Sequence, residues 1–325
     1  MTKFIRRLQK IGSSILVSLP KEWVDANNLS KSTPVEIETG QNSISITLTK
    51  GTEPSKEIII SYPLPKEENI VANITGAYLL GYDVINIKSK STIPVGDREK
   101  IRGSLRRLVG MEIFEEDSSN ISVQFILDES TLSPEKIFRR MSSIAFGMFN
   151  DILLGLFSDD KSNLQTLANR DDEIDRQYFL LVRLIRSTMV DKRLAGIFNL
   201  ENIDILDYRI AANLLETGGD TIVELANSLT NTSLSKNDLK KIYNITKDIE
   251  TIHKKSIDAF IDNNRSLAIE AINLHRKYQQ KSSDIRFSSE QKMHAPIDFL
   301  DLIYLFERVE RCWADIADLV KPVYK

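Results

Sequence analysis

Two pairs of acidic residues are the part of this sequence best suited to chemistry. Asp171 and Asp175 are four residues apart in one predicted helix, and Glu216 and Asp220 have the same spacing in another. Residues four apart on a helix are surface neighbours, so each pair presents two carboxylates side by side. If the two helices pack antiparallel, the pairs can converge into an oxygen-rich cage for a hard or borderline metal ion. Cages of this kind are built between the helices of bundles.

The same pairs can also be interpreted as parts of solvated helix faces. Like charges at this spacing slightly destabilise a helix, so two such pairs on adjacent helices favour a counter-ion. Carboxylates alone do not distinguish iron, zinc, manganese, magnesium and calcium, so the predicted cofactor is a divalent or trivalent metal ion without a specified identity. A di-metal enzyme is the weaker alternative, because the sequence shows no pairing of a nucleophile with a base. We therefore expect a protein that is not an enzyme.

Length and composition restrict the class of protein. The 325 residues exceed what one hydrophobic core usually serves, which predicts two or three domains. No apolar run approaches the ~20 residues that span a bilayer, so we expect a cytoplasmic protein. The single cysteine, Cys312, excludes an intramolecular disulfide. The three histidines, His253, His275 and His294, are scattered, and we expect each to be a surface residue.

Positive charge is concentrated at the N-terminus. Residues 1–24 contain five basic residues and one glutamate, a net charge of +4, which leaves −7 on the rest of a chain whose total is −3. A basic arm on an acidic body predicts a polyanionic partner for the arm.

The first fifty residues predict a small β module. A turn is expected at residues 10–13, and a short helix at residues 21–27 begins after Pro20. Alternating or apolar segments predict four short strands, at residues 4–8, 15–19, 35–38 and 43–48. Elements this few and short bury too little apolar surface to be stable alone. We therefore expect two chains to interleave their hairpins as a homodimer.

The run from Arg6 to Trp23 resembles the AbrB/SpoVT family of swapped-hairpin DNA-binding domains. Its glycine-serine turn at Gly12 and its final serine-leucine-proline-lysine-glutamate-tryptophan segment match that family's pattern, and the resemblance covers residues 3–48. It implies a dimeric β-barrel whose basic residues neutralise DNA phosphates. By position, the implied DNA contacts are Arg6, Arg7, Lys10, Ser13, Ser14 and Lys21. The alternative is a dimerisation clamp whose arginines are solvated.

Residues 55–130 predict a small α/β region with the element order β-α-β-α-β-β. Its second helix, expected at residues 97–109, carries a cluster of basic residues: Arg98, Lys100, Arg102, Arg106 and Arg107. The cluster can extend a nucleic-acid footprint, although a solvated helix face is the preferred interpretation. No glycine-rich phosphate loop follows a strand here, so nothing supports nucleotide binding.

The remaining residues predict six helices in two groups of three. Ser133 and Pro134 mark the start of the first helix, and Ser235 caps the fourth. The two groups are about ninety residues each, which indicates an internal duplication.

The helical half resembles the PhoU family of phosphate-uptake regulators over residues 131–322. The segment from Leu215 to Asp220 is similar to that family's acidic box, and the segment from Asp171 to Asp175 matches the partner box. The resemblance implies a metal site at Asp171, Asp175, Glu216 and Asp220. The second copy departs from the pattern, because Arg311 stands where an aspartate is expected. We expect Arg311 to pair with Glu307, one turn back, in place of a metal.

Together these features predict a multidomain α+β protein. Its N-terminal swapped-hairpin β-barrel is dimeric, a small α/β middle region follows, and tandem PhoU-like three-helix bundles complete the chain. The expected domains are residues 1–50, 55–130, 131–232 and 234–325. The predicted function is a phosphate-responsive transcriptional regulator that binds DNA and senses metal or phosphate. The alternative is a PhoU-type signalling adaptor that docks on a phosphate-transporter ATPase or a sensor kinase without binding DNA.

Overall fold

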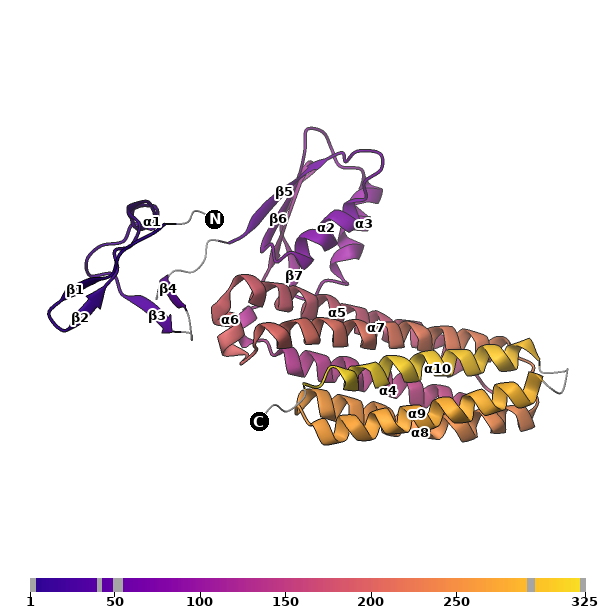
Figure 1. The fold of residues 1–325 in the computed structure, drawn as a ribbon. Coiled ribbons are helices and arrows are strands. Elements are labelled where there is room, and N and C mark those ends of the chain that lie inside the picture. The colour runs from indigo at the N-terminus through magenta and orange to yellow at the C-terminus, as the bar shows by residue number, and fades with distance from the viewer. Residues whose placement is uncertain (1–3, 40–42, 49–54, 291–295, 322–325) are drawn as a thin grey trace. The chain divides into compact units, whose positions relative to one another are not determined.

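The computed structural model describes the chain except for residues 1–3, 40–42, 49–54, 291–295 and 322–325 (Figure 1). The chain divides into two compact units, Met1–Ser55 and Lys56–Lys325. The second unit holds both the α/β layer and the helical half, so these two parts share one body.

The first unit consists of two antiparallel hairpins and a short helix. Its elements are β1 (Gln9–Ile11), β2 (Ser14–Leu16), α1 (Lys21–Ala26), β3 (Val35–Thr39) and β4 (Ile44–Leu48). β1 pairs with β2, and β3 pairs with β4. Gly12 closes the first turn with a φ of +62°, which glycine adopts without steric cost. The described residues of this single chain form no closed barrel.

The first predicted strand is wrong. Residues 4–8 have no strand assignment, and the strand begins only at Gln9. Ile5 is 93% exposed and Leu8 is 73% exposed. A strand requires a neighbouring backbone to complete its hydrogen bonds, and the described part of one chain provides none here. The β2 strand also ends at Leu16, three residues before its predicted end.

The second unit begins with a four-stranded sheet. Its strands are β5 (Glu57–Tyr62), β6 (Val84–Ser89), β7 (Met111–Glu116) and β8 (Asn120–Phe125). The spatial order is β5-β6-β8-β7, with β5 parallel to β6 and β8 antiparallel to both of its neighbours. Ile60, Ile87 and Ile121 lie side by side across three strands and are buried. The strand period of two places this apolar row on one face of the sheet.

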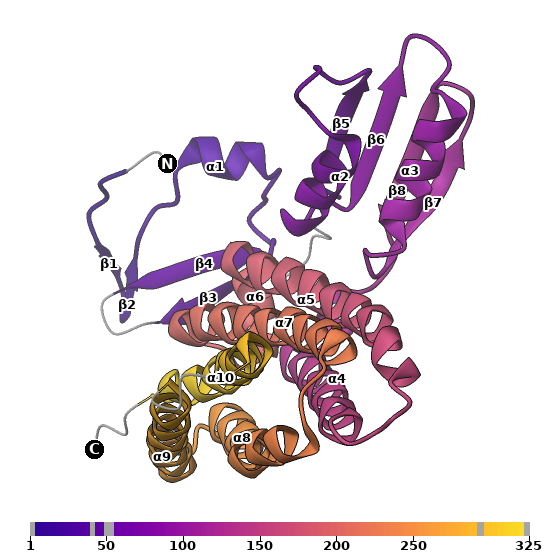
Figure 2. The same ribbon diagram turned by 90° about the vertical axis from the view of Figure 1, so that its right-hand side faces the viewer.

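Two helices cover that buried face, as Figure 2 shows: α2 (Ile70–Leu79) and α3 (Val95–Leu105). α2 begins at Ile70, because Asn69 caps it by accepting a hydrogen bond from the Val71 amide. α3 ends at Leu105 instead of the predicted residue 109. The element order β-α-β-α-β-β agrees with the prediction.

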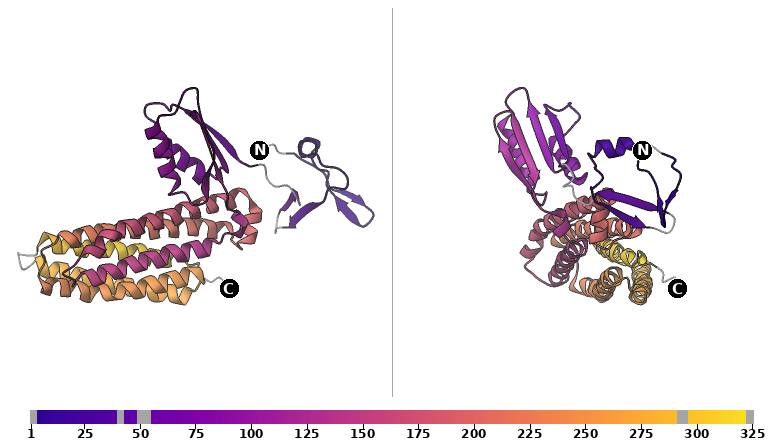
Figure 3. Two further views of the ribbon diagram at one scale, coloured as in Figure 1. Left: turned by 180° about the vertical axis from the view of Figure 1, so that it is seen from behind. Right: turned by 90° about the vertical axis from the view of Figure 1, so that its left-hand side faces the viewer.

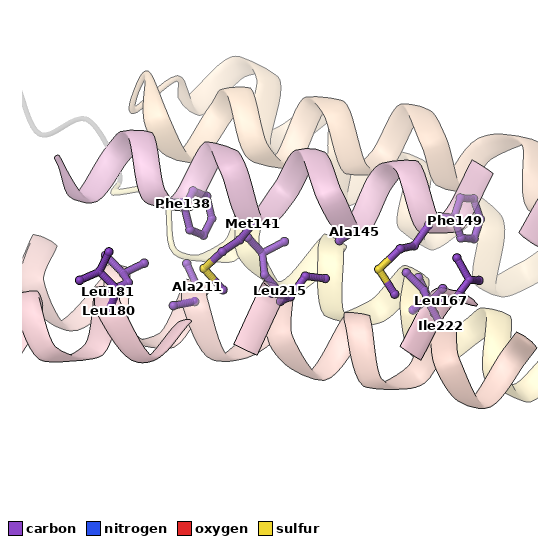
Figure 4. Packing of buried hydrophobic residues seen from close by; sticks show 14 of the residues in the cluster. Phe138, Met141, Ala145, Phe149, Leu167, Leu180, Leu181, Ala211, Leu215 and Ile222 are labelled. Carbon is purple, nitrogen blue, oxygen red and sulfur yellow. The ribbon is translucent and has the colours of Figure 1, made fainter. Parts of the chain in front are cut away.

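The first group of long helices follows the sheet. It contains α4 (Pro134–Gly155), α5 (Leu167–Val190), the short α6 (Lys192–Ile197) and α7 (Asn202–Asn231). Ser133 caps α4 as predicted. α4, α5 and α7 pack on one another. Figure 4 shows the apolar residues between them, including Phe138, Met141, Leu181 and Leu215, all of which are buried.

The second group contains α8 (Lys236–Ile261), α9 (Arg265–Glu290) and α10 (Ile297–Asp318). These three helices also pack on one another, and α10 packs along α7 to join the two groups (Figure 3). Ser235 caps α8 as predicted. The six long helices match the predicted pattern, whereas α6 was not predicted.

A buried arginine joins the α/β layer to the helical half. The Arg183 side chain, on α5, is only 1% exposed. Its guanidinium lies 3.8 Å from the centre of the Phe125 ring. It donates hydrogen bonds to four groups: Glu129 Oε1, the carbonyls of Tyr78 and Tyr82, and Asp83 Oδ1. Because these acceptors come from the layer and the segment that follows it, Arg183 fixes the layer to α5.

Candidate functional site

The four predicted metal ligands lie on the adjoining helices α5 and α7, close enough for their charges to interact. These helices run antiparallel. Asp171 lies next to Gly219, and Tyr178, two turns later on α5, forms a 3.2 Å hydrogen bond with Asn213, which comes earlier on α7. Asp171, Asp175 and Glu216 are partly buried, and Asp220 is exposed. The two acidic pairs are therefore close enough to affect one another's ionisation, and their role as metal ligands stays a prediction.

Burial and mutual repulsion change the protonation of this cluster. Burial, together with the charges of Asp220, Asp175 and Glu216, raises the pKa of Asp171 to about 7. Burial also raises the pKa of Asp175 and of Glu216, again with contributions from neighbouring carboxylates. Carboxylates that repel one another in a partly buried site are stabilised by a proton or by a cation.

Two features of the acidic cluster fit a cation. Asp171 Oδ1 is buried and has no hydrogen-bond partner in the described part of the chain. A Cβ atom at position 219 would lie only 2.6 Å from that oxygen. Glycine has no Cβ, so the oxygen can occupy this position without a steric clash. Within the described ranges, no group of three or more Asp, Glu, His or Cys side chains is arranged to hold a metal ion. The carboxylates are the oxygen ligands that hard cations prefer, but they do not form a complete ligand shell.

A guanidinium from the α/β layer reaches the same cluster. Arg107, between α3 and β7, forms an ion pair with Asp175 and lies 3.8 Å from Asp172. It opposes the rise in the pKa of Asp175 that burial causes. Its guanidinium also lies 6.0 Å from the centre of the Phe179 ring. Arg107 therefore supplies positive charge at the place where a metal ion is predicted.

The corresponding part of the second helix group is built differently. Glu310 on α10 is fully buried, and its two carboxylate oxygens lie 2.8 and 3.0 Å from His275 Nδ1 on α9. Gln279 Nε2 donates to Glu310 at 3.2 Å. This histidine is half-buried and paired, so the prediction that it is a simple surface residue is wrong.

The predicted pair of Arg311 with Glu307 is also wrong. Glu307 instead accepts a hydrogen bond from Ser282 and lies 3.1 Å from Arg286. Arg311 lies 4.0 Å from Asp315, one turn further along α10. Two groups on α9 satisfy Glu307, so the charge of Arg311 faces outward.

The prediction that His253 is a surface residue is also wrong. It is 5% exposed, stacks on Phe146 with ring centres 5.0 Å apart, and packs edge-on against Trp313 at 4.4 Å. Burial lowers the pKa of His253 to about 3, and its Nε2 lies 3.1 Å from Ser142 Oγ. Glu250 and His253 have the Glu-x-x-His spacing of bundle di-iron ligands, but the histidine is enclosed by aromatic rings. The third histidine, His294, lies outside the described residues.

The predicted DNA contacts are all exposed in the first unit: Arg6, Arg7, Lys10, Ser13, Ser14 and Lys21. The Arg6 guanidinium lies 5.6 Å from the centre of the Phe4 ring and donates to the Ile5 carbonyl at 3.3 Å. No carboxylate among the described residues forms an ion pair with the cations of this set. Their charge is therefore available to a polyanion.

The basic cluster on α3 is mostly neutralised. Arg102 forms an ion pair with Glu116 at 2.8 Å, and Arg98 lies 3.9 Å from the same carboxylate. Lys100 pairs with Asp97 at 2.9 Å. These pairs agree with a solvated helix face, which was the preferred interpretation of this cluster.

Comparisons with known families match two separate parts of the chain. Residues 138–229 match the family described as PhoU domain, and residues 8–59 match the family described as antidote-toxin recognition MazE, bacterial antitoxin. The chain combines a PhoU domain with an N-terminal MazE/AbrB-type domain. The PhoU match contains all four predicted metal ligands. The MazE match contains four of the six predicted DNA contacts, Lys10, Ser13, Ser14 and Lys21, whereas Arg6 and Arg7 lie just before its first residue.

Two solved PhoU structures are similar to this chain. The phosphate transport system regulatory protein PhoU from Streptococcus pneumoniae is 18% identical with a TM-score of 0.47, covering 57% of this chain and 91% of its own. PhoU from Pseudomonas aeruginosa is 14% identical with a TM-score of 0.43, covering 57% of this chain and 93% of its own. A search of the curated proteins found no match. Within the described residues, no helix has the length and apolar character needed to cross a membrane.

Two residues of this site were not predicted. Arg107 lies 68 positions before Asp175, so no local pattern connects them. Gly219 did leave a signal, because two consecutive glycines inside a helix each cost about 1 kcal/mol relative to alanine and require a reason. That reason at Gly219 is the close approach of Asp171.

Proposed function

We propose that this chain is a phosphate-responsive transcriptional regulator that is not an enzyme. It binds DNA through its N-terminal unit as a homodimer and senses metal or phosphate through its helical half. The observation that carries this proposal is the presence of a MazE/AbrB-type domain and a PhoU domain in one chain.

The helical half holds the sensor. Asp171, Asp175, Glu216 and Asp220 would bind a divalent or trivalent metal ion. When bound, the ion supplies the positive charge that the partly buried carboxylates lack. The unpartnered Asp171 Oδ1 and the missing side chain at Gly219 support this assignment.

We further propose that the two groups of three helices are tandem PhoU-like bundles of which only the first binds metal. His275 and Gln279 already satisfy Glu310 in the second group. Arg311 adds positive charge nearby, which disfavours a cation.

The N-terminal unit requires a second chain. None of its described residues is buried, and Ile15, Ile37 and Ile44 are 67%, 58% and 69% exposed. Pairing the hairpins of two chains into a swapped barrel would bury this apolar surface. The barrel would then present Arg6, Arg7 and their neighbours to DNA phosphates.

A double substitution tests the DNA half of the proposal. We expect Arg6→Ala with Arg7→Ala to weaken duplex binding about tenfold or more and to reduce the salt dependence of the affinity, because two phosphate contacts are lost. The matched control is Arg276→Ala with Lys277→Ala, which removes the same charge from exposed positions on α9. Equal affinities of both variants and the parent, across a salt titration, would remove DNA from the proposal.

A second candidate is a PhoU-type adaptor that docks on a phosphate-transporter ATPase or a sensor kinase. Exposed apolar residues near the end of α5 and the start of α7 favour it: Met189, Val190, Ile203 and Leu206 are 72%, 67%, 47% and 53% exposed. Affinity capture from cells grown at high and at low phosphate distinguishes the two. Transporter subunits or a kinase support the adaptor, and promoter fragments support the regulator.

A further inference from the structure

The acidic cluster already has a cation among its neighbours, and that cation belongs to a different part of the fold. The Asp175 side chain is 19% exposed and forms an ion pair with Arg107, whose own side chain is 51% exposed. The same guanidinium lies 3.8 Å from Asp172. Arg107 therefore approaches the cluster from the solvent side, whereas the Oδ1 atom of Asp171 is buried.

A metal ion and Arg107 would need the same carboxylate. An oxygen of Asp175 that is bonded to the guanidinium has fewer lone pairs available for a metal ion, and two positive charges at one carboxylate repel each other. The adjacent Arg106 differs, because it is exposed and has no ion pair among the described residues. Of these two neighbouring arginines, Arg107 contacts the acidic cluster and Arg106 does not, so Arg106 can serve as a control.

The α/β layer is fixed to α5 at two points of different strength. Arg183 is buried and bonds to the layer through four acceptors and an aromatic ring. Arg107 is half-exposed and bonds through one carboxylate with a second nearby. Exposed ion pairs contribute little to stability, so the Arg107 contact can break while Arg183 stays in place.

We propose that Arg107 is a competitor for the metal ion, built into the chain, and that metal binding at Asp175 releases it. This inference rests on the proposed metal site and adds its regulation. Release frees the turn that joins α3 to β7, while Arg183 continues to hold the layer on α5. Metal occupancy thereby changes the α/β layer, from which the chain runs through residues 49–54 to the N-terminal unit.

Metal affinity of the full chain tests the competition. In calorimetric titrations, we expect Arg107→Gln to bind Mn²⁺ about fivefold more tightly than the parent does. This is the change in affinity expected when an ion pair worth about 1 kcal/mol no longer competes with the metal ion. Arg106→Gln is the matched control and should stay within about twofold. Unchanged or weaker binding by Arg107→Gln overturns the inference while the metal site stands. Absence of Mn²⁺ binding by parent and variant overturns both the metal site and the inference.

Hydrogen exchange provides a second readout that does not depend on affinity. Mn²⁺ should speed amide exchange at residues 104–110 of the parent and leave that of Arg107→Gln unchanged, because its turn is already released. Asp175→Asn should show the faster exchange without any metal. Exchange in this segment that is insensitive to both Mn²⁺ and Asp175→Asn would contradict the release of Arg107.

Discussion

At the scale of single residues, burial and the charges of neighbouring carboxylates both disfavour the ionised form of Asp171. Its Oδ1 has no hydrogen-bond partner among the described residues, its neighbours include carboxylates, and its pKa is raised to about 7. The four-residue spacing was enough to predict which carboxylates converge. It was not enough to predict Arg107 or the contact with Gly219, because side chains that meet across helices leave no periodic pattern in the sequence.

The raised pKa of Asp171 predicts a pH-dependent stability in the absence of metal. Its pKa in the folded chain, about 7, exceeds its ordinary value of 3.8, so its contribution to stability is complete below pH 3.8 and is lost as the pH rises to about 7. Asp171→Asn does not ionise and should not lose stability in this way. With a chelator present, we expect the Tm of the parent to fall relative to that of Asp171→Asn as the pH rises from 5 to 8. The difference in Tm should change by about 2 °C or more. Parallel Tm profiles would show that Asp171 ionises normally.

The space beside Gly219 predicts a defect that is specific to metal binding. A Cβ at this position would lie 2.6 Å from Asp171 Oδ1 and 3.0 Å from Ile174 Cδ1, so the carboxylate must turn away. We expect Gly219→Ala to weaken Mn²⁺ binding about tenfold, while the better helix propensity of alanine offsets part of the strain. Gly103→Ala on α3 is the control, because nothing lies within 4 Å of its added Cβ. If both variants bind Mn²⁺ like the parent, Asp171 is not a ligand.

At the scale of secondary structure, local signals were sufficient for most of the chain. Ser133 and Ser235 cap their helices as predicted, and the apolar periodicity identified all six long helices. The failures have a common cause in contacts with distant parts of the fold or with another chain. Residues 4–8 are predicted as a strand but have no described neighbour to pair with. The buried Arg183 lies in a helix whose sequence does not distinguish it from Arg186.

Arg183 is therefore expected to contribute far more stability than its neighbour Arg186. Replacing Arg183 by methionine removes one donor each from Asp83, Glu129 and two backbone carbonyls. Breaking a buried ion pair in this way costs about 3–5 kcal/mol of unfolding free energy. Arg186 is exposed and donates one bond, to the Leu79 carbonyl at 3.1 Å, so Arg186→Met should cost less than about 1 kcal/mol. Urea denaturation of both variants measures the difference in unfolding free energy. Similar losses of stability in the two variants would contradict the role of Arg183 in fixing the α/β layer to α5.

At the scale of the whole molecule, the two units differ in how much they bury. The second unit has a continuous apolar core, whereas no described residue of the first unit is buried. Composition predicted this need for a partner chain, because fifty residues cannot supply a core. One chain alone does not show the predicted barrel, so the barrel and the homodimer stay predictions.

The apolar face of the β3–β4 hairpin predicts where the partner chain binds. Ile37 lies opposite Ile46, and Ile44 follows on the same face. Ile37→Glu places a charge in that face, and we expect it to convert a dimer into a monomer in sedimentation velocity, because burying an unpaired charge costs several kcal/mol. Glu36→Gln, on the opposite face of the hairpin, should remain dimeric. A dimer that persists in Ile37→Glu would place the interface elsewhere.

The central claim is that metal in the helical half controls DNA binding by the N-terminal unit. Fluorescence anisotropy of labelled promoter fragments, titrated with the full chain with and without Mn²⁺, tests it directly. We predict that Mn²⁺ changes the Kd for DNA about fivefold or more, the coupling typical of allosteric sites, and that Asp175→Asn with Asp220→Asn abolishes this change. A Kd that is the same with and without Mn²⁺ in the parent chain would contradict the account.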